Sequence, residues 1–272
     1  MFQVSNFTPA VSISVPFLTA LIVLSSKTAL AATPIGDCNH LLNFLNKELS
    51  GHIELTNDID CSTTPWYTRQ DGSNPFTGEF DGKGYTISNV FFPPEAYSQT
   101  TKPIGFFNYI NGATIKNLGL FNVTISIPAG EQSYQSEYAG GLVGVALNSK
   151  ISHVTVLGNV TMNRPADDRR ALGGIVGRAN HTTIEYADFS GSVSNAPNVG
   201  AIAGSVSNST LQNVYARNSI VHSSFPVYFA QNSFAGGLVG SLGTWEGGAT
   251  LDKCFYDGVV TGDSQTLGGG CR

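Results

Sequence analysis

The apolar and glycine positions of this chain recur at a spacing of roughly one structural unit. Residues 140–144 read Gly-Gly-Leu-Val-Gly, and related blocks begin near residues 104, 173, 200 and 236. Equivalent positions are separated by 36, 33, 27 and 36 residues when they are taken at Gly105, Gly141, Gly174, Ala201 and Gly237. A period in this range is typical of a solenoid, in which each unit buries its apolar face only against its neighbours.

A second apolar block follows each copy and predicts how one unit bends. Its first apolar residue is Ile87, Ile115, Ile151, Ile184, Leu211 or Leu251, and the next ones stand three and five residues later. A step of three does not fit a flat strand, whose side chains alternate between two faces. A bend is therefore expected between them, at positions where the blocks have Asn89, Asn117 and Asn213, because Asn tolerates a left-handed backbone.

A second bend is predicted further along each block. Only Gly or Asn occupies that column in the five later units, namely Asn122, Gly158, Gly191, Asn218 and Gly258, as a left-handed position requires. A third apolar segment follows. The pattern predicts an all-β chain folded as a right-handed parallel β-helix of about six three-strand coils, with a small N-terminal cap.

The glycine block followed by Thr-Ile-x-Asn and then Gly-x-Val resembles the GLUG motif repeat of bacterial secreted and surface proteins. The segment 76–87 is similar to the stretch that often precedes such repeats, and together they cover residues 74–262. The resemblance implies a secreted or cell-surface, adhesin-like protein without catalytic activity, which binds an extracellular glycan or a protein partner.

The first 73 residues are interpreted as a signal peptide and a cap. Residues 1–31 contain an apolar run and end in Ala29-Leu30-Ala31, which fits a signal peptidase site and predicts export. Residues 32–73 are expected to cap the first coil, with one helix beginning after Asp37, and residues 74–272 to form the repeats. No transmembrane helix is expected in the mature chain.

Composition and charge limit the classes of partner that this chain can bind. The chain has 14 Lys and Arg against 19 Asp and Glu, a net charge of −5, and such a surface repels nucleic acid. Charged residues make up only 12% of the chain and glycines number 31, which favours a tightly turned extracellular β protein. Nothing in the sequence predicts a cofactor or an oligomeric state.

The four cysteines form one local pair at each end, Cys38 with Cys61 and Cys254 with Cys271. In an exported protein this placement predicts two disulfides that staple the ends of the solenoid. The closed loops of 23 and 17 residues would each contribute roughly 3 kcal/mol in the chain-entropy model.

The candidate ligand-binding residues lie in an outward column of the coils. That column reads Phe91, Gly119, Thr155, Asp188, Tyr215 and Phe255, so Asp188, Tyr215 and Phe255 are expected to be neighbours on successive coils. The insert 225–229 adds Tyr228 and Phe229 beside them, and exposed aromatic faces suit sugars or protein partners. Alternatively, the insert folds back over the column as a local core.

No catalytic residue or metal ligand is assigned. Asp58, Asp60, Glu79 and Asp81 could hold calcium, but turns and a strand end account for them equally. Glu185, Asp188, Asp252 and Asp257 could supply the two carboxylates of a glycosidase. A polysaccharide lyase or hydrolase, or an accessory module of a larger secreted protein, therefore remains an alternative. A charged cluster lining successive coils would favour the enzyme.

Overall fold

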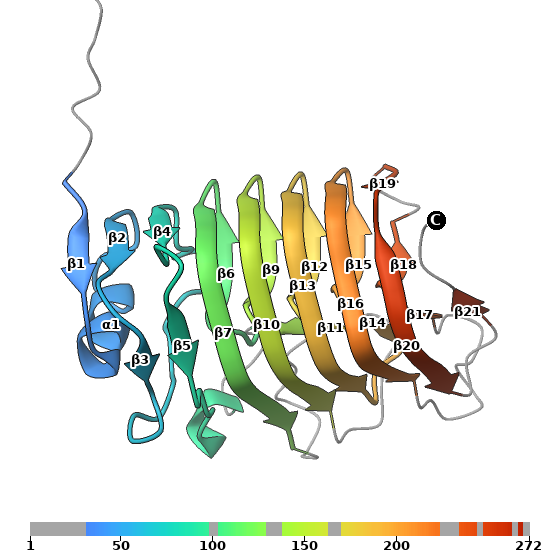
Figure 1. Ribbon diagram of the computed structural model, residues 1–272, viewed down its shortest axis with the longest axis horizontal. Helices are drawn as coiled ribbons and strands as arrows, with labels where there is room; N and C mark the ends of the chain where they lie inside the picture. The colour runs from blue at the N-terminus through green and yellow to red at the C-terminus, as the bar shows by residue number, and fades with distance from the viewer. Residues whose placement is uncertain are drawn as a thin grey trace, which may run out of the picture. The chain divides into compact units, whose positions relative to one another are not determined.

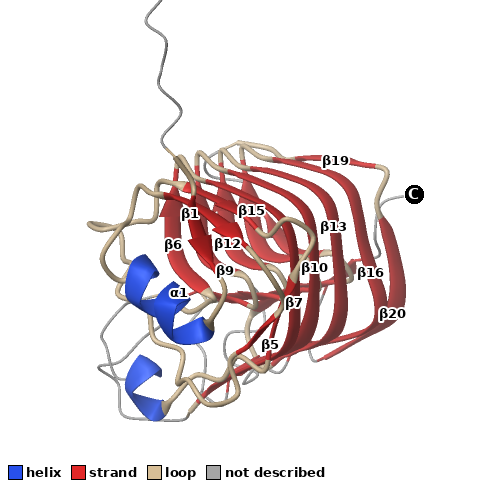
Figure 2. Cartoon of the chain, turned by 60° about the vertical axis from the view of Figure 1, so that its left-hand side comes forward, coloured by secondary structure: helices blue, strands red, loops and turns tan. Residues whose placement is uncertain are grey.

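The computed structural model describes residues 31–97, 103–128, 138–162, 170–223, 234–243, 247–262 and 266–268. These residues form a parallel β-helix, in which three parallel sheets run along the stack of coils (Figures 1 and 2). The all-β, parallel solenoid architecture expected from the repeat is thus confirmed. Residues 1–30, which contain most of the expected signal peptide, lie outside the described part of the chain.

The first sheet contains the long strands and extends from the N-terminal end to the last described coil. Its strands are β1 (Thr33–Ile35), β2 (His52–Leu55), β3 (Ile59–Asp60), β4 (Glu79–Asp81), β5 (Thr86–Ser88), β7 (Thr114–Ile127), β10 (Lys150–Met162), β13 (Thr183–Ser194), β16 (Thr210–Ser223), β19 (Thr250–Asp252) and β20 (Phe255–Gly262). Neighbouring strands are parallel throughout.

The two other sheets are built from the glycine blocks and the residues around them. One contains β8 (Tyr138–Gly140), β11 (Ala171–Gly173), β14 (Asn198–Gly200), β17 (Phe234–Gly236) and β21 (Thr266–Gly268). The other contains β6 (Phe107–Asn111), β9 (Val143–Leu147), β12 (Val176–Asn180), β15 (Ala203–Ser207) and β18 (Val239–Leu242). The described helices are α1 (Cys38–Leu45) and the short 3₁₀ helix η1 (Pro94–Tyr97), and neither is long and apolar enough to cross a membrane.

Each coil has three strands, but the structure divides them differently from the sequence prediction. The second block was expected to hold all three strands, whereas it forms one continuous strand such as β10 or β13, kinked at two positions. Between β10 and β13 the kinks do not shift the register, because both strands are kinked at the same positions. In the β7–β10, β13–β16 and β16–β20 pairs the register shifts by one residue at the second kink. The other two strands of the coil come from the glycine block.

The first kink lies at left-handed residues, as predicted. Their φ angles are between 50° and 54° at Asn117, His153, Tyr186, Asn213 and Lys253. The residues at the second kink are of two kinds. Asn122 and Asn218 are left-handed extra residues in bulges. Gly158 and Gly258 instead avoid a collision, because a Cβ there would strike the carbonyl oxygens of Val123 and Ser219.

The glycines of the repeat block, among them Gly141, Gly174 and Gly237, leave no room for a side chain. A Cβ at Gly174 would collide with the carbonyl oxygen of Ala201 and with the Phe189 ring. A Cβ at Gly237 would press against the Tyr256 ring. In the coil that has Ala201 in this column, the position of Phe189 and Tyr256 is taken by the smaller Ala216.

The first block of the repeat has a different register from the predicted one. Ile87 was expected beside Ile115, but it pairs with Leu120, and Phe80 takes the place beside Ile115. A turn with left-handed Lys83 and Gly84 replaces the single left-handed residue of later coils. Asn89 therefore belongs to the second kink, next to Asn122, and Phe91 pairs with Thr124 outside the predicted aromatic column.

The N-terminal end has its own packing. The carboxylate of Asp37 accepts a hydrogen bond of 2.8 Å from the backbone N–H of His40 and caps α1, whose Leu41 and Leu45 join the core. A disulfide joins Cys38 to Cys61, the pair expected from the sequence. Cys254 is also disulfide-bonded, while Cys271 lies outside the described residues.

Candidate functional site

The expected outward neighbours Asp188, Tyr215 and Phe255 are brought together by the long strands. Asp188 of β13 pairs with Tyr215 of β16, and Tyr215 pairs with Phe255 of β20. We call these three residues with Arg217 the outward strip. Each of the three column residues stands between two inward-facing residues of the chain, so its side chain points away from the core.

Arg217 links the members of the strip, which sequence reasoning did not predict. Its Nε lies 3.5 Å from Oδ2 of Asp188, and its guanidinium carbon lies 5.3 Å from the centre of the Tyr215 ring. Burial raises the pKa of the Asp188 carboxyl, although the charge of Arg217 and the backbone N–H of Phe189 oppose the shift. The strip thus combines a paired charge with a cation–π contact.

Apolar side chains continue the strip on the last described strands. Phe255 is 52% exposed, and Ile220 and Val259, which pair with each other across β16 and β20, are 53% and 55% exposed. The exposure of Phe255 identifies it as a surface side chain. The two other candidates, Tyr228 and Phe229, lie outside the described residues.

Three of the four acidic residues weighed as catalytic groups are engaged with other side chains. Oε1 of Glu185 lies 2.7 Å from the Lys150 ammonium, and Asp252 accepts a hydrogen bond of 2.9 Å from Gln212. Asp188 is paired with Arg217 as described above. The charge of Asp257, together with burial as the larger cause, raises the pKa of Tyr256 to about 12.

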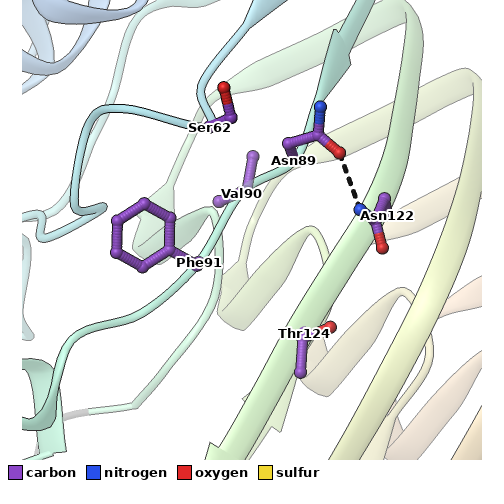
Figure 3. Close-up of a pocket in the computed structure, with 6 residues that line it drawn as sticks. All are labelled: Ser62, Asn89, Val90, Phe91, Asn122 and Thr124. Carbon is purple, nitrogen blue, oxygen red and sulfur yellow. Dashed lines mark hydrogen bonds between the residues drawn. The ribbon is translucent and has the colours of Figure 1, made fainter.

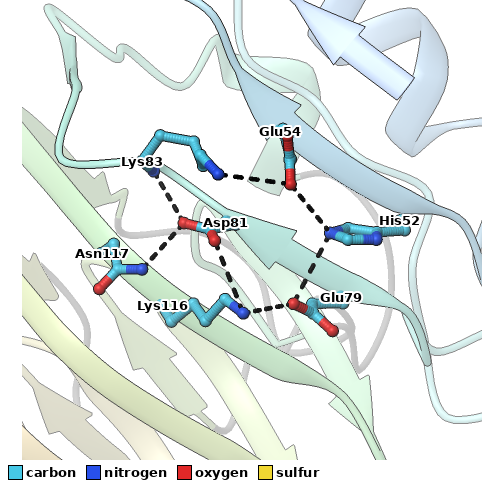
Figure 4. A network of polar contacts seen from close by, with 7 residues as sticks. All are labelled: His52, Glu54, Glu79, Asp81, Lys83, Lys116 and Asn117. Atoms are coloured by element: carbon cyan, nitrogen blue, oxygen red, sulfur yellow. Dashed lines mark hydrogen bonds and ion pairs between the residues drawn. The ribbon is translucent and has the colours of Figure 1, made fainter. Parts of the chain in front are cut away.

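The acids considered for calcium are also engaged with other groups. Asp58 accepts hydrogen bonds from the backbone N–H and hydroxyl of Thr86, and Asp60 accepts from Ser62 and Asn89. Glu79 and Asp81 belong to a charged network on β2, β4 and β7 (Figure 4). Within the described residues, no three His, Cys, Asp or Glu side chains are grouped as a metal site would require.

The charged network lies on successive strands, which the sequence did not reveal. Lys116 contacts Glu79 at 2.5 Å and Asp81 at 3.5 Å, and Lys83 reaches Glu54 at 3.6 Å. His52 lies 3.6 to 3.7 Å from Glu79 and Glu54 (Figure 4). The register places Glu54 directly opposite Asp81, an unfavourable pair that the lysines offset. These charges pair with one another across β2, β4 and β7.

Asp81 is the most buried acid of this network. Burial raises the pKa of its carboxyl, but the Asn117 amide, the backbone N–H of Lys83 and the charges of Lys116 and Lys83 outweigh it. The resulting pKa lies below the ordinary value, so the carboxylate is ionised at neutral pH.

A hollow beside Phe91 is a second feature that sequence reasoning missed. Its volume is about 300 Å³, and it is lined by Ser62, Asn89, Val90, Phe91, Asn122 and Thr124 (Figure 3). The register predicted for residues 86–90 was wrong and placed Phe91 in the outward aromatic column. The hollow was therefore not predicted. The sequence signal that could have shown it was the Gly-Lys-Gly turn at 82–84, which shifts the block that follows.

Comparison with known proteins supports the motif and the fold. Residues 135–161 match the family model described as the GLUG motif. An immunoglobulin A1 protease of Streptococcus pneumoniae is 27% identical over 193 residues, which cover 66% of this chain and 9% of the relative. Halomucin of Haloquadratum walsbyi is 28% identical over 144 residues, 48% of this chain and 1% of the relative.

A solved structure shares the fold. A Bacteroides ovatus protein described as a candidate immunoglobulin A1 protease has a TM-score of 0.57 at 15% identity, covering 89% of this chain and 84% of that one. The chain spans only 8 to 12% of the length of the streptococcal immunoglobulin A1 proteases that it matches.

Proposed function

We propose that the chain is a non-catalytic, adhesin-like binding module of a secreted or cell-surface protein, which holds an extracellular glycan or protein on its outward strip. The observation that supports this most directly is the alignment of Asp188, Tyr215 and Phe255 on adjacent strands with Arg217 stacked on Tyr215. The likeness to a small part of immunoglobulin A1 proteases and of halomucin fits an accessory module.

Between the two partner classes, the strip favours a protein surface. Tyr and Arg are enriched at the centres of protein interfaces, where they provide large contact areas with a polar end. Ile220 and Val259 extend the apolar area with branched aliphatic side chains. The names of the streptococcal relatives make immunoglobulin A1 the first protein to test.

The contacts made by the candidate carboxylates favour binding over cleavage. The candidate acids Glu185, Asp188 and Asp252 each have a polar or charged neighbour within 3.5 Å. A glycosidase needs two carboxyl groups directed at one bond, one of them a proton donor. A polysaccharide lyase or hydrolase would instead need a cleft between these residues.

The proposal includes export. Residues 1–31 would be the signal peptide, 32–73 the cap and 74–272 the repeats, so the mature chain would begin at about Ala32. Mass spectrometry of the native protein measures this start directly, and a retained Met1 in a soluble intracellular product would contradict export.

The binding test uses the purified mature chain against immobilised immunoglobulin A1 and against a glycan array, beside an activity assay on common polysaccharides. The Tyr215→Ala/Phe255→Ala variant is expected to weaken the binding that is found by tenfold or more, with the melting temperature nearly unchanged. Tyr85→Ala, which removes an exposed ring far along the stack, serves as the matched control. Unchanged binding with a large loss of stability would show that the two rings are structural.

A further inference from the structure

An exposed aromatic ring beside β5 stands at the rim of the hollow in Figure 3, on coils distant in sequence from the outward strip. Phe91 is 39% exposed, whereas its neighbour Val90 is buried and Phe92 packs against the core. A volume of about 300 Å³ is at the lower end of the range for small-molecule pockets. A second hollow of about 290 Å³ adjoins it and shares Phe91 and Thr124. The ring therefore borders two neighbouring hollows.

The backbone beneath the ring is held in place from two sides. The carbonyl oxygen of Phe91 accepts a hydrogen bond of 2.9 Å from the backbone N–H of the fully buried Trp66. On the other side, Thr124 donates its N–H to the carbonyl oxygen of Val90 at 3.3 Å, within a parallel bridge between Phe91 and Thr124. A platform fixed in this way loses little conformational freedom when a ligand binds.

The polar wall of the hollow is an oriented chain of amides. Asn122 donates from Nδ2 to Oδ1 of Asn89 at 2.6 Å (Figure 3). Asn89 in turn donates from Nδ2 to Oδ1 of Asp60 at 2.9 Å. Each amide has two N–H groups and a carbonyl oxygen. These two bonds use one N–H of each amide, so further donors and the Asn122 carbonyl oxygen can serve a ligand. The left-handed backbone at Asn89 and Asn122 fixes the direction of both side chains.

The charge around the hollow selects the kind of ligand. Its six lining residues include no ionisable side chain. Just behind the wall, hydrogen bonds from Asn89 and Ser62 lower the pKa of Asp60, which keeps this carboxyl ionised. A negatively charged ligand would be repelled by that carboxylate, and a cation would find no direct partner in the lining.

We propose that this hollow is a binding subsite for a neutral saccharide. The apolar face of one sugar ring would lie on Phe91, while its hydroxyls exchange hydrogen bonds with Asn89, Asn122 and Thr124. Sugars combine a C–H face with a rim of hydroxyls, and the lining offers the matching aromatic face and uncharged donors and acceptors. The inference is independent of the outward strip, because it uses none of its residues.

The test is a panel of neutral oligosaccharides of glucose, galactose, mannose and N-acetylglucosamine, together with sialylated and uronic acid counterparts, titrated against the mature chain by calorimetry and NMR. A neutral oligosaccharide is expected to bind and to shift the side-chain amide signals of Asn89 and Asn122. Phe91→Ala should raise the Kd about tenfold. Asn122→Gly should raise it severalfold, because glycine keeps the left-handed backbone but removes the amide.

Tyr215→Ala/Phe255→Ala is the control and should bind the same saccharide as the unmodified protein does. The proposal is overturned if no neutral saccharide binds at millimolar concentration, or if only acidic saccharides bind. It is also overturned if Phe91→Ala and Asn122→Gly fold normally and leave saccharide binding unchanged, or if Phe91→Ala abolishes only binding to immunoglobulin A1. If Tyr215→Ala/Phe255→Ala weakens binding to no partner, the proposed function of the outward strip is contradicted. That result would not bear on the saccharide subsite.

Discussion

The coils before residue 128 and those after residue 138 fill the same kind of cross-section with different side chains. The early coils pack large rings on one another, as where Trp66 stacks on Phe106 with ring centres 4.1 Å apart and Phe80 meets Phe107 edge to face. The later coils use mostly Val, Ile, Leu and Ala, and place glycine opposite the few larger residues. The packing of the early coils therefore depends on aromatic contacts that each occur once. The packing of the later coils depends on the contact between a glycine and a larger residue, which recurs from coil to coil.

The comparison also explains where the functional candidates lie. In the regular coils, equivalent residues stand directly over one another, so an outward column such as Asp188, Tyr215 and Phe255 forms a continuous strip. In the early coils the ladder is interrupted between β4 and β5, and short strands leave a hollow beside Phe91. The regular later coils thus form an extended outward strip, whereas the irregular early coils form a hollow.

The most severe test of the regular coils is Gly174→Val. The added side chain would meet the backbone oxygen of Ala201 and the Phe189 ring, and neither can move without displacing the neighbouring coil. We expect a loss of about 3 kcal/mol, which lowers the melting temperature by roughly 6–12 °C. Gly248→Ala is the matched control, because nothing lies near a Cβ there. An unchanged melting temperature for Gly174→Val would refute the packing described for these coils.

The early coils are tested by removing the Cys38–Cys61 disulfide with Cys38→Ser/Cys61→Ser. Opening a loop of 23 residues should cost about 2–4 kcal/mol. In a solenoid each unit contacts only its neighbours, so the loss should remain local. Hydrogen exchange is expected to quicken in β1 to β5 and to stay nearly unchanged in β13 to β16. Uniform quickening along the whole chain would show instead that the two regions unfold as one unit.

The smallest expected effect concerns the charged network through Asp81→Asn. The folded-state pKa of Asp81 is lowered, so its contribution to stability is complete above the unfolded pKa of about 3.9 and is lost as the pH falls through the folded value. At pH 7 the variant should lose about 1 kcal/mol, or roughly 2–4 °C of melting temperature. The two melting curves should begin to approach each other below about pH 4 and should converge once the pH falls below the folded-state pKa of Asp81. A difference that does not shrink over that range would rule out ionisation as the cause.

The sequence alone was sufficient for several features that recur, although not for the way each coil is divided into strands. Contacts between each coil and the next account for these features. They are the solenoid itself, the left-handed residues at Asn117 and Asn213, and the glycines that leave no room for a side chain. Such contacts impose the same residue type at the same interval, and that interval is visible in one sequence. The helix after Asp37 and the pairing of Cys38 with Cys61 followed from local capping and spacing.

Only the tertiary structure decided the contacts that occur once. The Asp81 to Gly84 turn shifts the register of the block that follows, so Ile87 packs beside Leu120 and Phe91 leaves the predicted column for the rim of a hollow. Arg217 stacks on Tyr215, and Glu79 of β4 contacts both His52 of β2 and Lys116 of β7. No repeated spacing in the sequence predicts either contact. A contact between non-equivalent residues has no period, and its geometry depends on where the chain places both partners in space.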